Sequence, residues 1–468
     1  MCHLDRTASK LCHLDRSAAQ WRDLHSPLAP PIRVPHLRRG LIAPKVGIVC
    51  GSKRPLSSTP TNRPPERPLH FAPALAATTI TSMPSLITLA DIQAAAQRIS
   101  LAAVRTPLVR LNPARLRMAG FPELAETAPA IYLKDESAQP IGSFKLRGAY
   151  NKIAQLSPDE LRRGVITYSS GNHAQGVAYA ARALGSKAVI VMPSNAPQIK
   201  RAATIALGAE IVIVGPASTE RKEKAEQLAA AHGYTIIPPY DDPAIIAGQA
   251  TCGLEILQQL PTVDLVLSPV SGGGLLSGVA TAIKLASAAQ IRVPHSSPLS
   301  GDGWGSQDPT QRAQIRVPHS SQSHRDEWDS QNADRGVQVW GCEPELAADA
   351  HASFTTRTLT EWSAADTSRT LCDGLRTQSL GALNFDHILR FVDGIVTITE
   401  AEIRTATRII LHATKLTAEP SGAITLAAAL FHTHQLPPAQ KVVVILSGGN
   451  LDPALRTELE SESLATPV

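Results

Sequence analysis

The sequence lacks any run of about 18 apolar residues, and it contains only six cysteines in 468 residues. A transmembrane helix needs about 20 predominantly apolar residues, so we expect no membrane-spanning segment and no membrane partner. The cysteines show neither CxxC spacing nor the dense framework of a small secreted protein. We therefore expect reduced, mostly structural thiols in a cytoplasmic protein.

A general excess of positive charge is also absent. The formal net charge is +5, but residues 1–82 hold 12 Lys or Arg against four Asp or Glu. The rest of the chain carries 33 basic and 36 acidic residues. Because the surplus is confined to a Pro-, Arg- and Ser-rich segment without helical or strand periodicity, no nucleic-acid partner is predicted.

Some short stretches of sequence occur more than once. The pentapeptide CHLDR begins at Cys2 and at Cys12, and IRVPH begins at Ile32, Ile291 and Ile315. The last two copies belong to a tandem repeat of 24 residues, 290–313 and 314–337. Two short polar copies are too few and too polar to bury a core of their own.

The shared pentapeptide suggests a common origin for the N-terminal segment and the internal repeat. We hypothesise that both are translated copies of a repetitive nucleic-acid element. Residues 1–82 are then a disordered extension of a chain that natively begins at Met83, and 290–335 is a surface insertion. The alternative for an arginine-rich, acid-poor N-terminus is an organelle transit peptide.

From Met83 onward, short apolar runs alternate with longer helical stretches. The expected strands are 131–136, 165–168, 188–192, 211–214, 265–267, 337–340 and 442–446. The expected helices include one from about Phe144, one at 174–184 and one at 275–285. This alternation predicts an α/β fold, with parallel or mostly parallel sheets flanked by helices on both faces.

Polar and glycine-rich segments follow several of these strands. Lys145 lies in the segment SFKLRGAYN, and the later loops read SSGNHAQG from Ser169, SGGG from Ser271 and LSGGN from Leu446. Ligands of α/β proteins bind at the carboxyl ends of strands. A desolvated lysine at such an edge can form a Schiff base. A lone lysine in the first turn of a helix is more often simply solvated.

The SGGG loop lies between a strand and a helix. Consecutive glycines allow backbone N–H groups to converge on a phosphate, with the positive end of the helix behind them. The alternative is a turn that packs closely on a neighbouring helix. The loop is neither G-x-G-x-x-G nor a Walker A sequence, so dinucleotides and ATP are poor candidates for the ligand.

The SSGNH loop also lies between a strand and a helix. Its backbone, hydroxyl and amide groups suit a carboxylate or a phenolic oxygen, although Ser169, Ser170 or Asn172 could instead be an ordinary N-cap. His173 considered alone is more typical of a structural histidine. Ser447 ends the last strand, where its hydroxyl is placed to meet a ring nitrogen.

Taken together, these motifs resemble the threonine dehydratase/serine racemase branch of the fold-type II pyridoxal-phosphate enzymes. The resemblance covers about Met83 to Pro453, apart from the insertion. It implies pyridoxal phosphate as cofactor, bound in the cleft between two domains. Residues 83–160 with 240–455 would form the large cofactor-binding domain, and 161–239 the small α/β domain.

The resemblance also implies roles for individual residues. Lys145 would be the Schiff-base lysine, Phe144 would pack near the cofactor ring, Asn172 would bind the phenolic oxygen, Gly272, Gly273 and Gly274 would cradle the phosphate, and Ser447 would face the pyridine nitrogen. Ser169, Asn172 and His173 would take the substrate carboxylate. Ser271 departs from the family, which often has a fourth glycine there.

A divalent cation, Mg²⁺ or Ca²⁺, is implied in the same way. In related enzymes it lies between the equivalents of Glu343, the Ala347 carbonyl and Asp349. Two carboxylates and a carbonyl suit a hard cation completed by water. The alternative is a solvated acidic start of a helix.

The reaction implied by the resemblance begins when the substrate amine replaces Lys145, which then removes the α-proton. Loss of a β-hydroxyl leads to a 2-keto acid and ammonia, whereas return of a proton from the opposite face racemises the amino acid. Ser170 matches the opposite-face group of the serine racemases, and many threonine dehydratases have alanine there.

We expect dehydration of L-threonine and L-serine to 2-oxobutanoate or pyruvate, with serine racemisation as the alternative. A third possibility, a pseudo-enzyme subunit, is disfavoured by the intact Lys145 and Ser170. Only 18 residues follow Asn450, too few for a regulatory domain. The family suggests a homodimer or homotetramer acting on a small amino acid.

Overall fold

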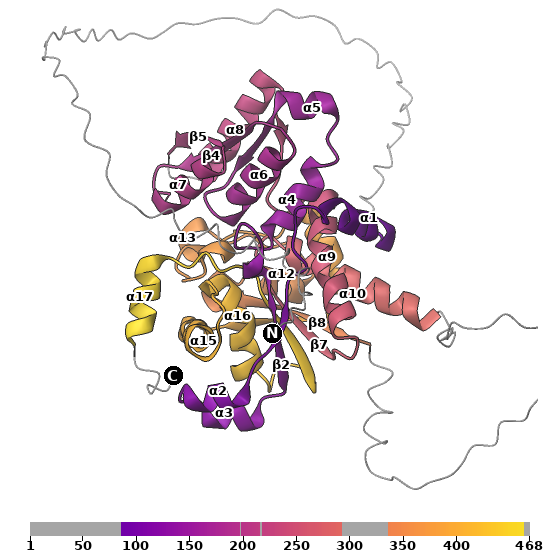
Figure 1. Cartoon of the computed structure of the whole chain (residues 1–468), viewed down its shortest axis with the longest axis vertical. Helices are drawn as coiled ribbons and strands as arrows, with labels where there is room; N and C mark the ends of the chain where they lie inside the picture. Colours follow the sequence, from indigo (N-terminus) through magenta and orange to yellow (C-terminus); the bar gives the residue numbers. More distant parts are fainter. Residues whose placement is uncertain (1–85, 197, 216–217, 293–335, 463–468) are drawn as a thin grey trace, which may run out of the picture. The chain divides into compact units, whose positions relative to one another are not determined.

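The computed structural model describes residues 86–462, apart from 197, 216–217 and 293–335 (Figure 1). All of them belong to one compact unit, Ile80–Val468. The extension expected at 1–82 and nearly all of the insertion expected at 290–335 lie outside the described residues. None of the described helices combines the length and apolar character that crossing a bilayer requires.

The larger of the two sheets has six strands in the order β1-β2-β10-β7-β8-β9. Their bounds are Leu108–Arg110 (β1), Ala130–Asp135 (β2), Leu265–Pro269 (β7), Gln338–Pro344 (β8), Gly394–Ile398 (β9) and Lys441–Leu446 (β10). Only the edge strand β1 is antiparallel to its neighbour. β10 is a central strand, with Val442 opposite Ile131 on one side and Leu265 on the other.

The smaller sheet has four strands, all parallel, in the order β5-β4-β3-β6. Their bounds are Val165–Tyr168 (β3), Ala188–Pro193 (β4), Glu210–Val214 (β5) and Thr235–Ile236 (β6). All four lie within the range 161–239 expected for a small domain. The division of the compact unit into a large and a small domain stays a prediction.

Helices connect most of the strands. The α-helices are Leu89–Ile99 (α1), Pro113–Met118 (α2), Pro122–Thr127 (α3), Lys145–Ile153 (α4), Pro158–Arg163 (α5), Asn172–Ala183 (α6), Gln198–Ala206 (α7), Ser218–His232 (α8), Pro243–Gln259 (α9), Gly274–Arg292 (α10), Asp349–Thr356 (α12), Ala364–Thr367 (α13), Ala382–Phe391 (α14), Glu400–Ala413 (α15), Pro420–Phe431 (α16) and Pro453–Ser461 (α17). Short 3-10 turns occur at Glu136–Ala138 (η1), Glu345–Ala347 (η2) and Asp373–Leu375 (η3).

Both faces of the six-stranded sheet are covered by helices, and the central strand β10 shows this residue by residue. Val442 and Val444 pack in one cluster with Ile424 of α16. Val443 points the other way and packs with Val279 of α10. A strand buried on both faces carries a continuous apolar run, which is why VVVIL was recognisable in the sequence.

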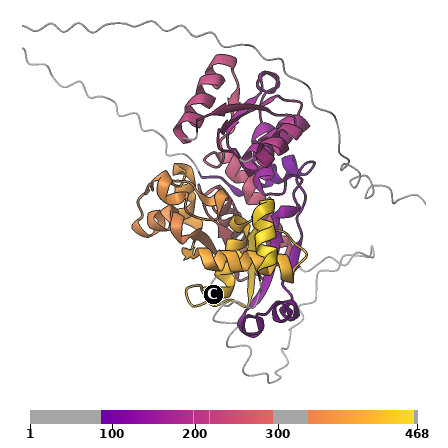
Figure 2. The same cartoon turned by 90° about the vertical axis from the view of Figure 1, so that its left-hand side faces the viewer.

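The four-stranded sheet is covered in the same manner (Figure 2). Val165 and Ile190 pack with Ala178 of α6, whereas Ile166 on the opposite face packs with Ala225 of α8. The predicted α/β fold of parallel sheets flanked by helices is therefore confirmed.

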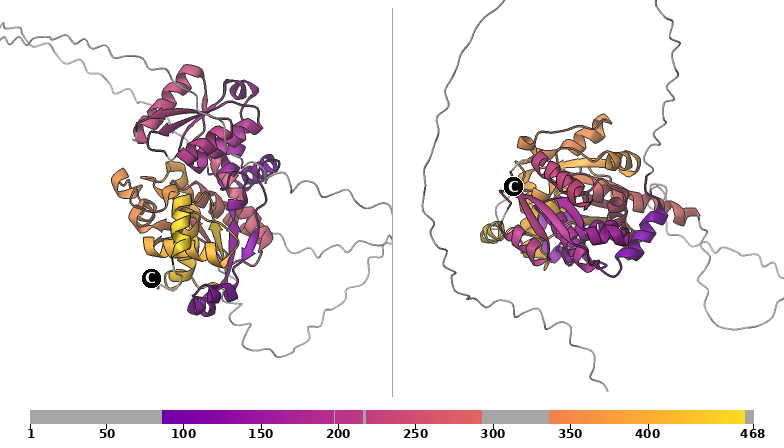
Figure 3. Two further views of the ribbon diagram at one scale, coloured as in Figure 1. Left: turned by 60° about the vertical axis from the view of Figure 1, so that its left-hand side comes forward. Right: turned by 90° about the horizontal axis from the view of Figure 1, so that it is seen from above.

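The described chain ends on the surface of the larger sheet's helical layer. Helix α17, yellow in Figure 3, packs on α15. Arg404 of α15 forms ion pairs with Glu458 and Glu462 at this contact.

The structure adds three strands that the sequence pattern did not predict. β1 and β6 have three and two residues, too short to show any periodicity. β9 was also missed, although four of its five residues are buried. The helix α10 extends to Arg292, so the first three residues of the 24-residue repeat are helical instead of belonging to the insertion.

The three cysteines of the described chain match the expectation of reduced structural thiols. Cys252, Cys342 and Cys372 are free and buried. Burial raises the pKa of each thiol, which keeps it protonated and unreactive.

Candidate active site

The predicted site loops follow the carboxyl ends of β3 in the four-stranded sheet and of β7 and β10 in the six-stranded sheet, and such strand ends are where α/β proteins bind ligands. The segment before Lys145 is attached directly to the loop after β10. The Phe144 N–H donates to the Ser447 carbonyl at 3.0 Å, and Ser143 forms an isolated bridge with Gly448. Two motifs about 300 positions apart in the sequence thus share hydrogen bonds.

Lys145 is the first residue of α4, as predicted. Its Nζ donates to the Pro239 carbonyl at 2.9 Å and lies 5.1 Å from the centre of the Phe144 ring. Desolvation lowers the pKa of Lys145 to about 8. Lys145 is thus held by a backbone carbonyl and an aromatic ring, which differs from the freely solvated lysine of the alternative.

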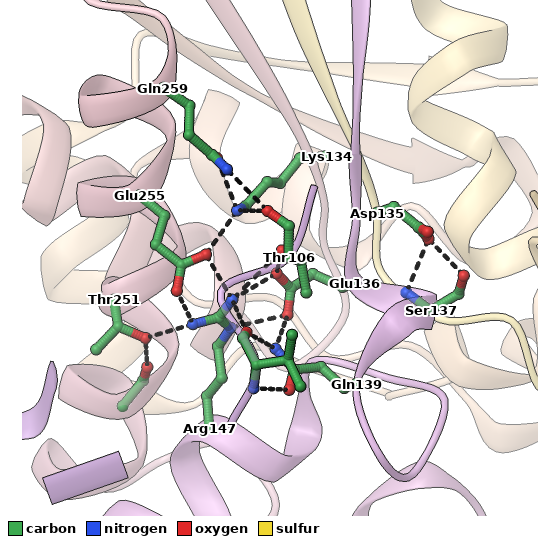
Figure 4. A network of polar contacts seen from close by, with 12 residues as sticks. Thr106, Lys134, Asp135, Glu136, Ser137, Gln139, Arg147, Thr251, Glu255 and Gln259 are labelled. Carbon is green, nitrogen blue, oxygen red and sulfur yellow. Dashed lines mark hydrogen bonds and ion pairs between the residues drawn. The ribbon is translucent and has the colours of Figure 1, made fainter. Parts of the chain in front are cut away.

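A buried ionic network ties α4 to its neighbours (Figure 4). Arg147, two residues after Lys145, contacts Glu136 at 2.8 Å and Glu255 of α9 at 2.7 Å. Lys134 of β2 contacts Glu255 at 2.6 Å. Burial alone would raise the pKa of Glu136, but the Arg147 charge and hydrogen bonds lower it to about 2. Two cations and two carboxylates balance, so the start of α4 is held between β2 and α9.

The glycine loop after β7 has its backbone orientation set by α14. The Gly272 carbonyl accepts hydrogen bonds from Asn384 Nδ2 at 2.9 Å and from the Gly381 N–H at 3.1 Å. In a trans peptide the N–H points opposite to the carbonyl, so the Gly273 N–H points away from α14. Gly273 has φ +97°, which favours glycine.

The same glycines are also required for packing. A Cβ on Gly272 would lie 2.4 Å from the Tyr240 ring, and one on Gly273 would lie 2.8 Å from the Asn384 Cβ. The loop is therefore a closely packed turn, as the alternative interpretation expected. It is also held in a fixed orientation at the N-terminus of α10, which begins at Gly274. The Ser271 hydroxyl hydrogen-bonds the Thr377 hydroxyl at 2.8 Å.

The loop after β3 presents Asn172 as the first residue of α6. Asn172 Nδ2 donates to Glu419 Oε1 at 2.7 Å, and Asn172 Oδ1 accepts from Asn450 Nδ2 at 2.7 Å. Ser169 Oγ accepts a long bond of 3.4 Å from the Gly171 N–H. Ser170 is partly exposed in the same loop.

His173 is buried and structurally engaged. Its Nε2 lies 3.0 Å from the Ile237 carbonyl, which can only accept, so Nε2 carries the proton. Desolvation and the nearby Lys145 charge lower the pKa of His173 to about 3. The ring is therefore neutral near pH 7, and its assignment to the substrate carboxylate stays a prediction.

Ser447 directly follows β10 and is buried. Its hydroxyl donates to the Ser421 carbonyl of α16 at 3.3 Å. This bond is long, so the hydroxyl can be redirected to a stronger acceptor at small cost.

The three residues predicted to bind a cation are close in sequence. The carboxylates of Glu343 and Asp349 nevertheless lie in different environments. Glu343 accepts the Ala350 N–H at 2.9 Å and the His351 N–H at 2.7 Å, as a cap of α12. Both carboxylate oxygens of Asp349 are buried without a hydrogen-bond partner among the described residues. Burial and the Asp349 charge raise the pKa of Glu343, and burial raises that of Asp349 to about 7. Ala347 is buried in η2.

The described residues contain no group of three His, Cys, Asp or Glu side chains arranged to hold a metal. Any cation here would depend on two carboxylates, a carbonyl and water. The alternative of a solvated acidic helix start is wrong, because Glu343 and Asp349 are both buried.

Several residues around the site were not predicted from the sequence. Asn450 stood inside the LSGGN motif, where only Ser447 received a role. No sequence motif pointed to Glu419, Tyr240 or Asp241, because each is distant in sequence from the motif that it contacts in the folded protein. Asp241 Oδ1 accepts the Leu383 and Asn384 N–H groups at 3.0 and 3.3 Å and so caps the helix that orients the glycine loop.

Comparisons with known proteins identify the family of this chain. The family model described as "Pyridoxal-phosphate dependent enzyme" matches residues 99–316 and 326–448. The L-threonine ammonia-lyase of Thermotoga maritima is 36% identical over 78% of this chain and 76% of its own length. The L-threo-3-hydroxyaspartate ammonia-lyase of Saccharomyces cerevisiae is 33% identical over 69% of this chain and 83% of its own.

A solved structure shows the same fold. The serine racemase of Dictyostelium discoideum superposes with a TM-score of 0.61 and 30% identity, covering 78% of this chain and 99% of that one. The resemblance seen in the motifs is thus confirmed: the chain belongs to the family of pyridoxal-phosphate dependent enzymes, in the branch that contains threonine dehydratases and serine racemases.

Proposed function

We propose that this chain is an ammonia-lyase that converts L-threonine to 2-oxobutanoate and L-serine to pyruvate, each with release of ammonia. The observation that carries the proposal is the environment of Lys145. It is an amine with a pKa near 8, placed at the helix start where the loops after β3 and β10 are joined by hydrogen bonds. The similar ammonia-lyases support the choice of reaction.

The residues present fit pyridoxal phosphate. The oriented Gly272–Gly274 backbone at the start of α10 would hold the phosphate. Lys145 would bind the aldehyde carbon, Asn172 the phenolic oxygen, and Ser447 the pyridine nitrogen. When bound, this cofactor supplies an electron-withdrawing ring that takes up the charge left by the departing α-proton.

Lys145 and His173 have different roles in the reaction. Lys145, once displaced by the substrate amine, is a base of suitable pKa to accept the α-proton at Nζ. His173 is neutral and donates to Ile237, so it does not compete for that proton. Loss of the β-hydroxyl and hydrolysis complete the net change from amino acid to 2-keto acid and ammonia.

The test is to incubate the protein with L-threonine and L-serine in separate reactions and to measure 2-oxobutanoate, pyruvate and D-serine. We expect both keto acids, and we expect Lys145→Ala to lose them together with the visible absorbance of the bound cofactor. Retention of that absorbance in Lys145→Ala would refute the role of this lysine. Absence of keto acids from wild type would refute the proposed reaction.

Serine racemisation is the second candidate function, favoured by Ser170 and by the similar serine racemase. Ser170 is partly exposed in the loop that carries Asn172. If it returns a proton from the opposite face, Ser170→Ala will lose D-serine production and keep pyruvate production. If D-serine is absent from wild-type reactions, racemisation is excluded.

The similar proteins also raise the question of which hydroxylated amino acid is the preferred substrate. Because one similar enzyme acts on L-threo-3-hydroxyaspartate, the same assay should include that amino acid and measure oxaloacetate. We propose threonine and serine as the better substrates. A kcat/KM for hydroxyaspartate above that for both would overturn this order.

We also propose that Glu343, Asp349 and the Ala347 carbonyl hold Mg²⁺ or Ca²⁺. The support is the pair of unpartnered Asp349 oxygens, which are costly to bury and suit a hard cation.

A further inference from the structure

Asn172 lies in a chain of hydrogen bonds that runs from a backbone carbonyl to a carboxylate. Asn450 Nδ2 donates to the Ile141 carbonyl at 3.0 Å and to Asn172 Oδ1 at 2.7 Å. Asn172 Nδ2 then donates to Glu419 Oε1 at 2.7 Å. The members come from three loops, before α4, after β10 and before α16, together with the start of α6.

The order of donors and acceptors in this chain allows only one orientation of the Asn450 and Asn172 side-chain amides. The Ile141 carbonyl only accepts, so the Asn450 group facing it is the NH₂ end of the amide. The same nitrogen faces Asn172, which must therefore present its oxygen. The Asn172 nitrogen is left to face Glu419, which accepts whether or not its other oxygen is protonated.

One N–H of Asn172 remains to be assigned. An amide nitrogen carries two N–H groups, and Glu419 accepts one of them. Without Glu419 and Asn450, the side chain would be free to turn and present its oxygen instead, which would repel an anionic oxygen.

The surrounding backbone leaves space for this chain of bonds. A Cβ on Gly448 would lie 2.6 Å from Glu419 Oε1 and 3.1 Å from Asn172 Nδ2. A Cβ on Gly142, which has φ +73°, would lie 2.5 Å from Asn450 Oδ1. Two glycines on either side of the chain thus admit the side chains that form it.

We propose that Glu419 and Asn450 are positioning residues that orient the Asn172 amide, so that its second N–H points to the phenolic oxygen of pyridoxal phosphate. The inference rests on the proposed function, since it requires that this cofactor binds. It explains two features that the motif assignment left without a role, Asn450 of LSGGN and the glycine at 448.

Glu419 has further charged neighbours, but they do not alter this geometry. Burial and the Asp373 charge raise its pKa to about 7, whereas the Asn172 hydrogen bond and Lys200 lower it. Lys200 forms an ion pair with Asp373. Because Oε1 accepts in both protonation states, the orientation of Asn172 is maintained across neutral pH.

The test is a double-mutant cycle on the holoenzyme, with the rate of cofactor release on dilution as the readout. We expect Glu419→Ala and Asn450→Ala each to release pyridoxal phosphate about tenfold faster, the effect of losing one good hydrogen bond to a charged group. In an Asn172→Ala background the same two changes should alter release by less than about twofold, because the group they orient is gone.

Two further variants separate positioning from general damage. Glu419→Gln keeps an acceptor oxygen and should release the cofactor within about threefold of wild type. Glu400→Ala removes a carboxylate that accepts the Leu371 N–H at 2.7 Å, and it should leave release unchanged. If Glu419→Ala fails to fold, the Asn450→Ala arm of the cycle still decides.

The outcomes are distinct. Equal acceleration in the wild-type and Asn172→Ala backgrounds would overturn the positioning role while leaving the proposed function intact. A wild-type protein that shows no bound cofactor and no keto-acid production would instead refute the proposed function.

Discussion

At the scale of single residues, the folded surroundings of Lys145 change the chemistry of its amine. An exposed lysine has a pKa near 10.4, so about one molecule in a few thousand carries a neutral amine at pH 7. With a pKa of about 8, roughly one in ten does. The cause is desolvation, and within the described part of the chain Nζ donates to the neutral Pro239 carbonyl.

The first prediction concerns the pH dependence of this amine. The lowered pKa means that the reactive neutral form is lost as pH falls below about 8. Capture of pyridoxal phosphate by the apoprotein should therefore rise about tenfold per pH unit up to about 8 and then level off. Stopped-flow absorbance measures this rate. A rise that continues to pH 10 would show that the amine is not desolvated.

The second prediction concerns Asp349. A cation that binds its unpartnered carboxylate stabilises the folded state, by about 2.7 kcal/mol when its concentration is 100 times its Kd. Mg²⁺ or Ca²⁺ should raise the Tm of wild type, and Asp349→Asn should abolish the rise. An equal rise in both proteins, measured by calorimetry after treatment with EDTA, would place the cation elsewhere.

At the scale of secondary-structure elements, the start of α4 depends on charges that come from other elements. Arg147 is fully buried, and its partners Glu136 and Glu255 lie on η1 and α9. A buried pair contributes little compared with apolar residues of the same size, but loss of one partner leaves a charge without compensation. The network therefore holds the first turn of α4, which contains Lys145, against η1 and α9.

The third prediction follows from that asymmetry. Arg147→Ala should lower the free energy of unfolding by ~3–5 kcal/mol, because two carboxylates lose their main counter-charge. Arg162→Ala is the matched control: its ion pair with Asp159 is exposed, and its loss should cost less than ~1 kcal/mol. Urea denaturation measures both. Similar costs for the two variants would show that the buried network has no special role.

At the scale of the whole molecule, the elements on either side of residues 293–335 belong to the fold in their own right. Helix α10 before it packs with α9, and β8 after it pairs with β7 in continuous register from Gln338. Both α10 and β8 therefore have packing contacts of their own, and the surface insertion stays a prediction.

The fourth prediction is that residues 293–335 are dispensable. Replacing them with a flexible linker of about 12 Gly and Ser residues should change the free energy of unfolding by no more than ~1 kcal/mol, because loop length affects closure entropy only weakly. Keto-acid production should be retained. Loss of folding in this variant, judged by circular dichroism and Tm, would mean that the repeat belongs to the fold.

Elements of the fold and of the site could be predicted where they depend on residues adjacent in the sequence. The apolar run of β10 predicted a strand, and the glycines of SGGG predicted a loop at a helix start, because both depend on neighbours within a few positions. β6, with two residues, left no such signal. The role of Asn172 was inferred from resemblance, while the residues that orient it were missed.

The sequence by itself therefore determined the α/β alternation, the glycine-rich loops and the lysine that opens a helix, because periodicity and backbone freedom are written in adjacent residues. Only the tertiary structure decided what surrounds them. Asn172 meets Glu419 and Asn450 across 247 and 278 positions, and Lys145 meets Pro239 across 94. Desolvation and hydrogen-bond partners arise from packing between such distant segments, and those are the quantities that set the charge of Lys145 and the orientation of Asn172.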